Sequence, residues 1–173
     1  TLSGKGSMYE KPKALKPFCN NNKVKKIVVK NGIKNIDNDC FRQFKGLKKA
    51  VIADSVVSIG YAFSCCRELK SIKLPKNLEK IEMSAFYYTP VKKTKIPAGS
   101  FIEPWAFSES GVESVIFESG TEVVPNEAFY QTGMDIYGLQ EMYLPKSVKV
   151  FYLNGNYSST TYYEGTNEEL KKI

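Results

Sequence analysis

The sequence predicts a solenoid of stacked repeats, built on one parallel β-sheet of about six short strands with irregular or short helical turns on the opposite side. Two observations support this fold class. An apolar frame recurs six times along the chain, and a phenylalanine recurs every 21 to 23 residues in the second half of each repeat. A unit of this length cannot bury its own apolar side chains, so neighbouring units must stack into a continuous core.

Each repeat opens with a short strand. The last two apolar residues of the frame are two positions apart, which places both side chains on one face of the strand. Pro75, Pro97 and Pro145 end three of these runs, because proline cannot donate to a β-ladder. The six runs are Val24-Ile27-Val29, Leu47-Ala50-Ile52, Leu69-Ile72-Leu74, Val91-Thr94-Ile96, Val112-Val115-Phe117 and Leu139-Met142-Leu144.

The second half of each repeat carries an aliphatic residue followed by a small residue and a phenylalanine. Ile81 precedes Ala85-Phe86, for example, and Ile102 precedes Ala106-Phe107. We expect the phenylalanines to form one buried column in the core rather than a ligand cage. The members of this column are Phe41, Phe63, Phe86, Phe107 and Phe129, and Phe18 fits the same position in a degenerate half-repeat.

The full pattern, L-x-x-I-x-[IL]-P followed by I and then A-F-x-x-[CST], resembles the BspA-like leucine-rich repeats of bacterial surface proteins. Cys66, Thr89, Ser110 and Thr132 fill its last position, whereas Phe44 departs from it. The resemblance covers about residues 18–145, and the tail over residues 162–173 is similar to segments that follow such repeats. It implies a leucine-rich-repeat fold and a secreted or surface-attached bacterial protein that mediates adhesion, including adhesion to host matrix proteins.

The pattern divides the chain into three parts. Residues 1–23 are expected to form a loose N-terminal arm and the degenerate half-repeat, and residues 24–145 the leucine-rich repeats. Residues 146–173 are expected to cap the C-terminal end, with a tight turn at Asn154-Gly155 and a short helix opened by a capping box of Thr166 and Glu169. Met134 to Gly138 lengthen the fifth repeat, between the frames that begin at Val112 and Leu139, and predict a loop.

The composition argues against catalysis and against a cofactor or metal. The chain has no histidine, which removes the usual general base and the imidazole ligands. Cys65 and Cys66 are adjacent and therefore lack the spacing of a metal site. A disulfide bond between Cys19 and Cys40 is one alternative that the sequence allows. No apolar run is long enough to span a membrane. No signal peptide is visible, which we interpret as a mature or trimmed chain.

Charge is distributed very unevenly along the chain. Residues 1–98 contain 21 basic and seven acidic residues, whereas residues 99–173 contain four basic and 11 acidic residues. Many of the lysines stand at outward positions of the predicted strands, so we expect them to form adjacent columns on the sheet. These candidate binding residues are Lys25, Lys26, Lys48, Lys49, Lys70, Lys73, Lys92, Lys93 and Lys95.

The predicted function is a non-catalytic binding protein, extracellular or at the cell surface, that mediates adhesion or protein–protein interaction through the sheet face. Its partner would be a host matrix protein or another surface protein. One alternative is a polyanion- or glycan-binding module that uses the lysines, and another is a structural assembly repeat of a longer surface protein. The lysines could also serve only as a solvated surface. Nucleic acid is disfavoured, because no aromatic residues are interleaved with the lysines.

Overall fold

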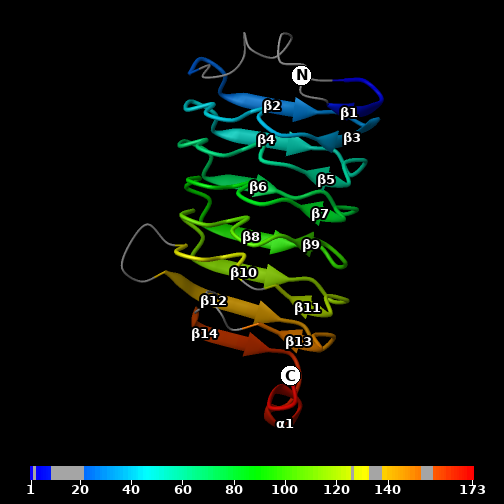
Figure 1. The fold of residues 1–173 in the computed structure, drawn as a ribbon, viewed down its shortest axis with the longest axis vertical. Coiled ribbons are helices and arrows are strands. Elements are labelled where there is room, and N and C mark those ends of the chain that lie inside the picture. Colours follow the sequence, from blue (N-terminus) through cyan, green and yellow to red (C-terminus); the bar gives the residue numbers. More distant parts are fainter. Residues whose placement is uncertain (2, 9–21, 126, 133–137, 153–157) are drawn as a thin grey trace.

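A computed structural model describes residues 1, 3–8, 22–125, 127–132, 138–152 and 158–173. The chain winds into coils that stack along the long axis of the molecule, from the N-terminal to the C-terminal end (Figure 1). The predicted fold class, a parallel solenoid of leucine-rich-repeat type, is confirmed. The first five coils each contribute one longer strand, one shorter strand and one turn, which contains Cys40-Phe41 in the first coil and an Ala-Phe pair in the next four.

The longer strands form the predicted parallel sheet. They are β2 (Lys26–Val29), β4 (Lys49–Ile52), β6 (Ser71–Lys73), β8 (Lys93–Ile96), β10 (Ser114–Phe117), β12 (Leu139–Leu144) and β14 (Ser158–Tyr163). Hydrogen bonding joins β2 to β4 to β6, and β8 to β10 to β12 to β14. Within the described chain no ladder joins β6 to β8, so this sheet is divided between the third and fourth coils.

A second row of parallel strands, which the sequence did not predict, lies beside the first (Figure 1). Its aliphatic residues, such as Ile59 opposite Ile81 and Ile81 opposite Ile102, point into the core, and the ladder is only about two residues long in each coil. We had expected irregular or short helical turns here. The members are β1 (Gly6–Met8), β3 (Ile33–Ile36), β5 (Ser58–Ile59), β7 (Lys80–Ile81), β9 (Phe101–Ile102), β11 (Val123–Val124) and β13 (Val150–Phe151).

The Ala-Phe turns close the third side of each coil and stack the phenylalanines as predicted. Phe63, Phe86 and Phe107 are fully buried, with ring centroids 5.6 Å apart for the first pair and 4.8 Å apart for the second. Backbone hydrogen bonds join successive turns, for example from Phe86 N to Ala106 O at 2.8 Å. The small alanine lets the backbones approach this closely, so the turns are held together by hydrogen bonds as well as by packing.

A short strand lies at the N-terminal end of the described chain. Residues 6–8 form β1, which pairs in parallel with β3 and covers the edge of the first repeat. Gly6 N donates to Gly32 O at 2.9 Å, and both glycines have positive φ. Residues 9–21 lie outside the described residues, and with them Phe18 and Cys19. The half-repeat and the Cys19–Cys40 bridge therefore stay predictions.

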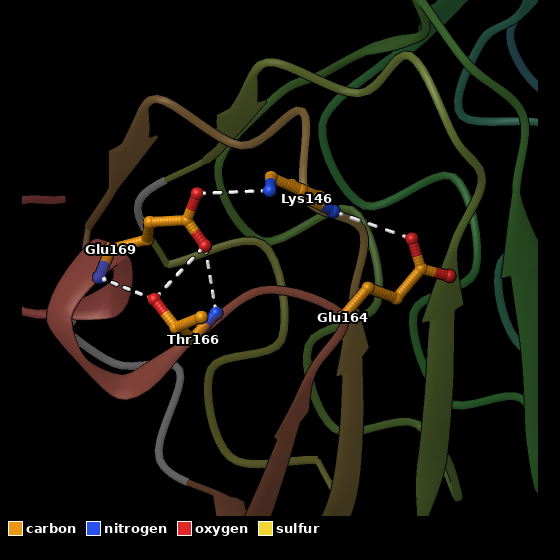
Figure 2. Close-up of polar contacts among 4 residues, drawn as sticks. All are labelled: Lys146, Glu164, Thr166 and Glu169. Atoms are coloured by element: carbon orange, nitrogen blue, oxygen red, sulfur yellow. Dashed lines mark hydrogen bonds and ion pairs between the residues drawn. The ribbon is translucent and has the colours of Figure 1, made fainter.

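The C-terminal end contains the predicted short helix, α1 (Asn167–Leu170). Thr166 Oγ1 accepts from Glu169 N at 3.2 Å, and Thr166 N donates to Glu169 Oε2 at 2.8 Å, which completes the predicted capping box (Figure 2). An ion pair joins the helix to the end of the last repeat, because the Lys146 ammonium lies 3.0 Å from Glu169 Oε1. The expected tight turn at Asn154-Gly155 and most of the expected loop at 134–138 lie outside the described residues.

Acidification is expected to open this cap. The hydrogen bond from Thr166 N, followed by the Lys146 ammonium, lowers the pKa of Glu169 from 4.5 to about 2. A carboxylate with a lowered pKa in the folded state stabilises the fold above its unfolded pKa and loses that contribution as the pH falls through the folded pKa. In an NMR titration we therefore expect the Thr166 and Glu169 amides to shift with a midpoint near pH 2. A midpoint near 4.5 would contradict the capping box.

Candidate functional site

The outward side of the longer strands forms one exposed surface, which we call the strand face. Side chains alternate along each strand, so that Ala50 and Ile52 of β4 are buried while Lys49 and Val51 are exposed. The same alternation holds in β8, where Lys93 and Lys95 are exposed. The parallel register then places outward residues of successive coils side by side, about 4.8 Å apart.

The structure places all nine predicted lysines at exposed positions on or next to the longer strands. Lys26 lies directly opposite Lys49, and Lys48 N donates to Lys25 O at 2.9 Å, so the first two coils form the expected pair of lysine columns. In the third coil, Ser71 lies opposite Lys49 and takes the next position in the column of Lys26 and Lys49. The columns are not continuous beyond this point, because the ladder is interrupted between β6 and β8.

On the strand face, ion pairs between coils begin where the basic half of the chain meets the acidic half. The Lys92 ammonium contacts the carboxylate of Glu113, and Lys95 Nζ lies 3.0 Å from Glu118 Oε1, so both lysines are partly neutralised by the next coil. Charge on the remaining lysines is not balanced in this way. Within the part of the chain that the structure describes, no carboxylate lies within 4.0 Å of the ammonium groups of Lys25, Lys26, Lys48, Lys49, Lys70, Lys73 and Lys93.

A hollow of about 400 Å³ lies at the interruption between β6 and β8. Lys73, Lys76, Lys93 and Lys95 line it, together with Glu118, which pairs with Lys95, and apolar residues such as Ile116. Like charges on adjacent strands repel each other, which opposes close pairing of β6 and β8. Lys76 was not predicted as a site residue, because it follows the strand and its place in the hollow depends on how the third and fourth coils stack. The hollow therefore concentrates four lysines above an apolar floor.

The acidic half of the strand face carries an apolar and aromatic column. Ile116 lies opposite Tyr143, and Tyr143 lies opposite Tyr162. The two tyrosine rings are stacked, with centroids 4.5 Å apart, and Ile116 and Tyr162 are exposed. One outward position differs from expectation, because Ser114 is buried between the longer side chains of Lys93 and Glu141. The strand face thus joins a basic region to an aromatic region.

The residues that the structure describes contain no group of three histidine, cysteine, aspartate or glutamate residues arranged to hold a metal ion. The Cys66 thiol is buried, which raises its pKa to about 12, and it donates to Phe41 O at 3.1 Å. A thiol in that state is not a nucleophile. In the residues that the structure describes, no helix has the length and apolar character needed to cross a membrane.

Comparisons with known proteins agree with this fold. A leucine-rich repeat protein from Bacteroides ovatus ATCC 8483 is 23% identical, with a TM-score of 0.59, over 80% of this chain and 34% of that chain. A leucine-rich repeat protein from Eubacterium ventriosum ATCC 27560 is 17% identical, with a TM-score of 0.56, over 93% of this chain and 66% of that chain. The match thus covers about one third of the first structure and two thirds of the second. A sequence comparison with curated proteins found no match.

The repeat pattern itself identifies the family. The BspA type leucine rich repeat region matches residues 15–135 in six copies, which is most of the chain. The matched residues include the first five strand frames, the Ala-Phe turns and all nine lysines of the strand face. Both solved structures named above are likewise bacterial leucine-rich repeat proteins. The chain therefore belongs to the BspA-type leucine-rich repeat family.

Proposed function

We propose that this protein is a non-catalytic adhesion protein, secreted or held at the cell surface, that binds a host matrix protein or another surface protein through the strand face. The observation that carries the proposal is the unbalanced basic region, which lies on the same exposed surface as the Ile116–Tyr143–Tyr162 column. Protein interfaces combine buried aromatic anchors with a charged rim. This arrangement suits a partner that presents acidic side chains around an apolar patch.

Membership of the BspA-type family is compatible with this role. Leucine-rich repeats present extended surfaces for binding proteins, and the strands of this chain supply such a surface over seven coils. A positive field over the first four coils would also speed the encounter with an acidic partner. The location at the cell surface and the choice of partner rest on the family and on this surface chemistry together.

An anionic glycan is a second candidate partner, and the hollow between β6 and β8 favours it. Four lysines surround a volume of about 400 Å³, and a sulfate or carboxylate group there would offset their mutual repulsion. The apolar floor would contact the body of a sugar ring. The glycan and protein candidates differ in their response to salt, because binding led by sulfate groups weakens steeply as salt rises.

Both candidates are tested by measuring binding of the purified protein to a panel of host matrix proteins and to heparin, at low and at physiological salt. Binding to a matrix protein that persists at physiological salt is the expected result. Binding to heparin alone, lost at physiological salt, would replace the adhesion proposal with the glycan alternative. No binding anywhere on the panel would contradict both candidates and favour a structural role within a longer surface protein.

A further inference from the structure

A second hollow, of about 400 Å³, lies on the turns of the third to fifth coils, away from the strand face. We call it the turn hollow. Its lining includes the aromatic residues Tyr87, Trp105 and Tyr130 and the acidic residues Glu109 and Glu127. Trp105 is 43% exposed and Tyr130 is 41% exposed, in contrast to the buried phenylalanines of the same turns. Exposed aromatic residues and carboxylates line the same hollow here, in contrast to the basic region of the strand face.

The backbone of the turns holds these side chains in place. Trp105, Glu109 and Glu127 all have φ between +54° and +60°, the left-handed conformation that recurs two residues before and after the buried phenylalanines. Trp105 N donates to Glu127 O at 2.9 Å, and Glu109 N donates to Tyr130 O at 3.4 Å. Stacking of the fourth coil on the fifth therefore brings the two aromatic residues and the two glutamates to one place.

The described residues supply no basic partner for the carboxylates of the turn hollow. Among the residues that the structure describes, no ammonium or guanidinium nitrogen lies within 4.0 Å of Glu109 or Glu127. Burial, together with Tyr88 and Glu109, raises the pKa of Tyr87, so this tyrosine stays neutral at physiological pH. The hollow thus carries two unbalanced negative charges beside exposed aromatic faces.

Earlier coils show which group suits an aromatic ring at this position. The Arg42 guanidinium lies over the Tyr61 ring, 4.8 Å from its centroid. Arg42 directly follows Phe41, and Tyr61 stands two residues before Phe63. In the turn hollow Trp105 takes the position of Tyr61, two residues before Phe107, but Tyr87 takes the position of Arg42, directly after Phe86. Trp105 therefore keeps the aromatic surface, but within the described part of the chain no arginine lies over its ring.

We propose that the turn hollow binds an arginine side chain of a protein partner. The guanidinium would stack on the Trp105 ring, as Arg42 does on Tyr61, and its N–H groups would donate to the carboxylates of Glu109 and Glu127. Arginine suits the site better than lysine, because a planar guanidinium can stack and donate to two carboxylates at once. This second site has the opposite charge preference to the strand face and does not depend on the function proposed for that face.

The only tryptophan of the chain is Trp105, so intrinsic fluorescence reports directly on the turn hollow. We would titrate the protein with the peptide acetyl-Gly-Arg-Gly-amide and, separately, with the same peptide containing citrulline, which has the same shape without the charge. The expected result is a saturable change in Trp105 emission with the arginine peptide and at least about tenfold weaker binding of the citrulline peptide. Equal responses to both peptides, or no response to either, would overturn the proposal.

Variants separate this site from the strand face. The double variant Glu109→Gln, Glu127→Gln keeps the size of both side chains and should weaken binding of the arginine peptide by about tenfold or more. Glu164→Gln together with Glu168→Gln removes two charges from exposed residues of the C-terminal cap, and this matched control should leave binding unchanged. Equal binding by the double variant and the control would contradict a role for the two carboxylates. Replacing strand-face lysines by glutamate should leave binding of the arginine peptide unchanged. Loss of binding at the turn hollow can therefore be distinguished from loss of binding at the strand face.

Discussion

Replacing Phe86 by alanine is expected to destabilise the protein by about 3–5 kcal/mol, the range of core phenylalanine truncations. Phe86 is fully buried, and its ring stacks on Phe63 on one side and on Phe107 on the other. The substitution removes both stacking contacts and leaves a cavity in the middle of the column. Because each coil is stabilised mainly by its neighbours, the two halves of the solenoid should also unfold less cooperatively. Urea unfolding followed by circular dichroism measures both effects.

Phe101→Ala is the matched control for this prediction. Phe101 lies in β9 of an adjacent coil and is 61% exposed, so the same truncation should change the free energy of unfolding by only about 0.5 kcal/mol. Similar losses in the two variants would contradict the assignment of Phe86 to a buried column. An unchanged unfolding midpoint for Phe86→Ala would contradict the repeat register from which the whole fold is derived.

The second large effect is expected on binding. The triple variant Lys49→Glu, Lys73→Glu, Lys93→Glu should lose about 100-fold in affinity for the matrix protein that the wild-type protein binds. Loss of three charge contacts and their replacement by repulsion amount to about 3 kcal/mol. These lysines have no carboxylate within 4.0 Å in the described chain, whereas Lys92 and Lys95 are paired with Glu113 and Glu118. Stability should be kept, because Lys26 would then face a glutamate at position 49.

A control with the same change in net charge isolates the effect of position. Lys5, Lys34 and Lys172 are exposed and lie away from the strand face, so reversing all three to glutamate changes the net charge equally. Biolayer interferometry at physiological salt should show near wild-type affinity for this control. Equal losses in the two triple variants would mean that binding responds to net charge alone, and the strand face would then have no special role.

Much of the fold could be predicted because the same residue pattern recurs several times along the chain. The spacing of Phe41, Phe63, Phe86, Phe107 and Phe129 determined the register of every coil, and the structure stacks these rings as expected. Thr166 and Glu169 predicted the helix cap correctly, because a capping box depends on two residues only three positions apart. One of these signals is periodic and the other is local, and both kinds can be recognised in a single sequence.

The features that escaped prediction depend on contacts between coils. Two-residue strands such as Ser58–Ile59 are too short to show a period of two, so the second row of strands was invisible. The break between β6 and β8 follows from how two particular coils meet, and so does the neutralisation of Lys95 by Glu118. Thr94 shows the same limit, because it stands in an apolar column with its hydroxyl buried and without a hydrogen-bond partner among the described residues.

The turn hollow was missed for a related reason. Its aromatic and acidic residues are up to 43 positions apart between Tyr87 and Tyr130, and nothing in their spacing marks them as a group. The repeated phenylalanines of these turns predict a buried core, and they give no sign of exposed residues on the same turns. Comparing the same turn position across coils, Tyr61 with Trp105 and Arg42 with Tyr87, is the signal that could have drawn attention to this surface.

The central claim is that the strand face is the binding surface, and a steric block tests it most directly. In a background of Cys19→Ser and Cys65→Ser, a maleimide-linked polyethylene glycol would be attached either at Val51→Cys or at Val123→Cys. Val51 is 40% exposed on the strand face, and Val123 is 48% exposed in the second row of strands. We predict that the label at 51 abolishes binding to the matrix protein and that the label at 123 does not. Binding that survives the label at 51 but is lost with the label at 123 would contradict the account.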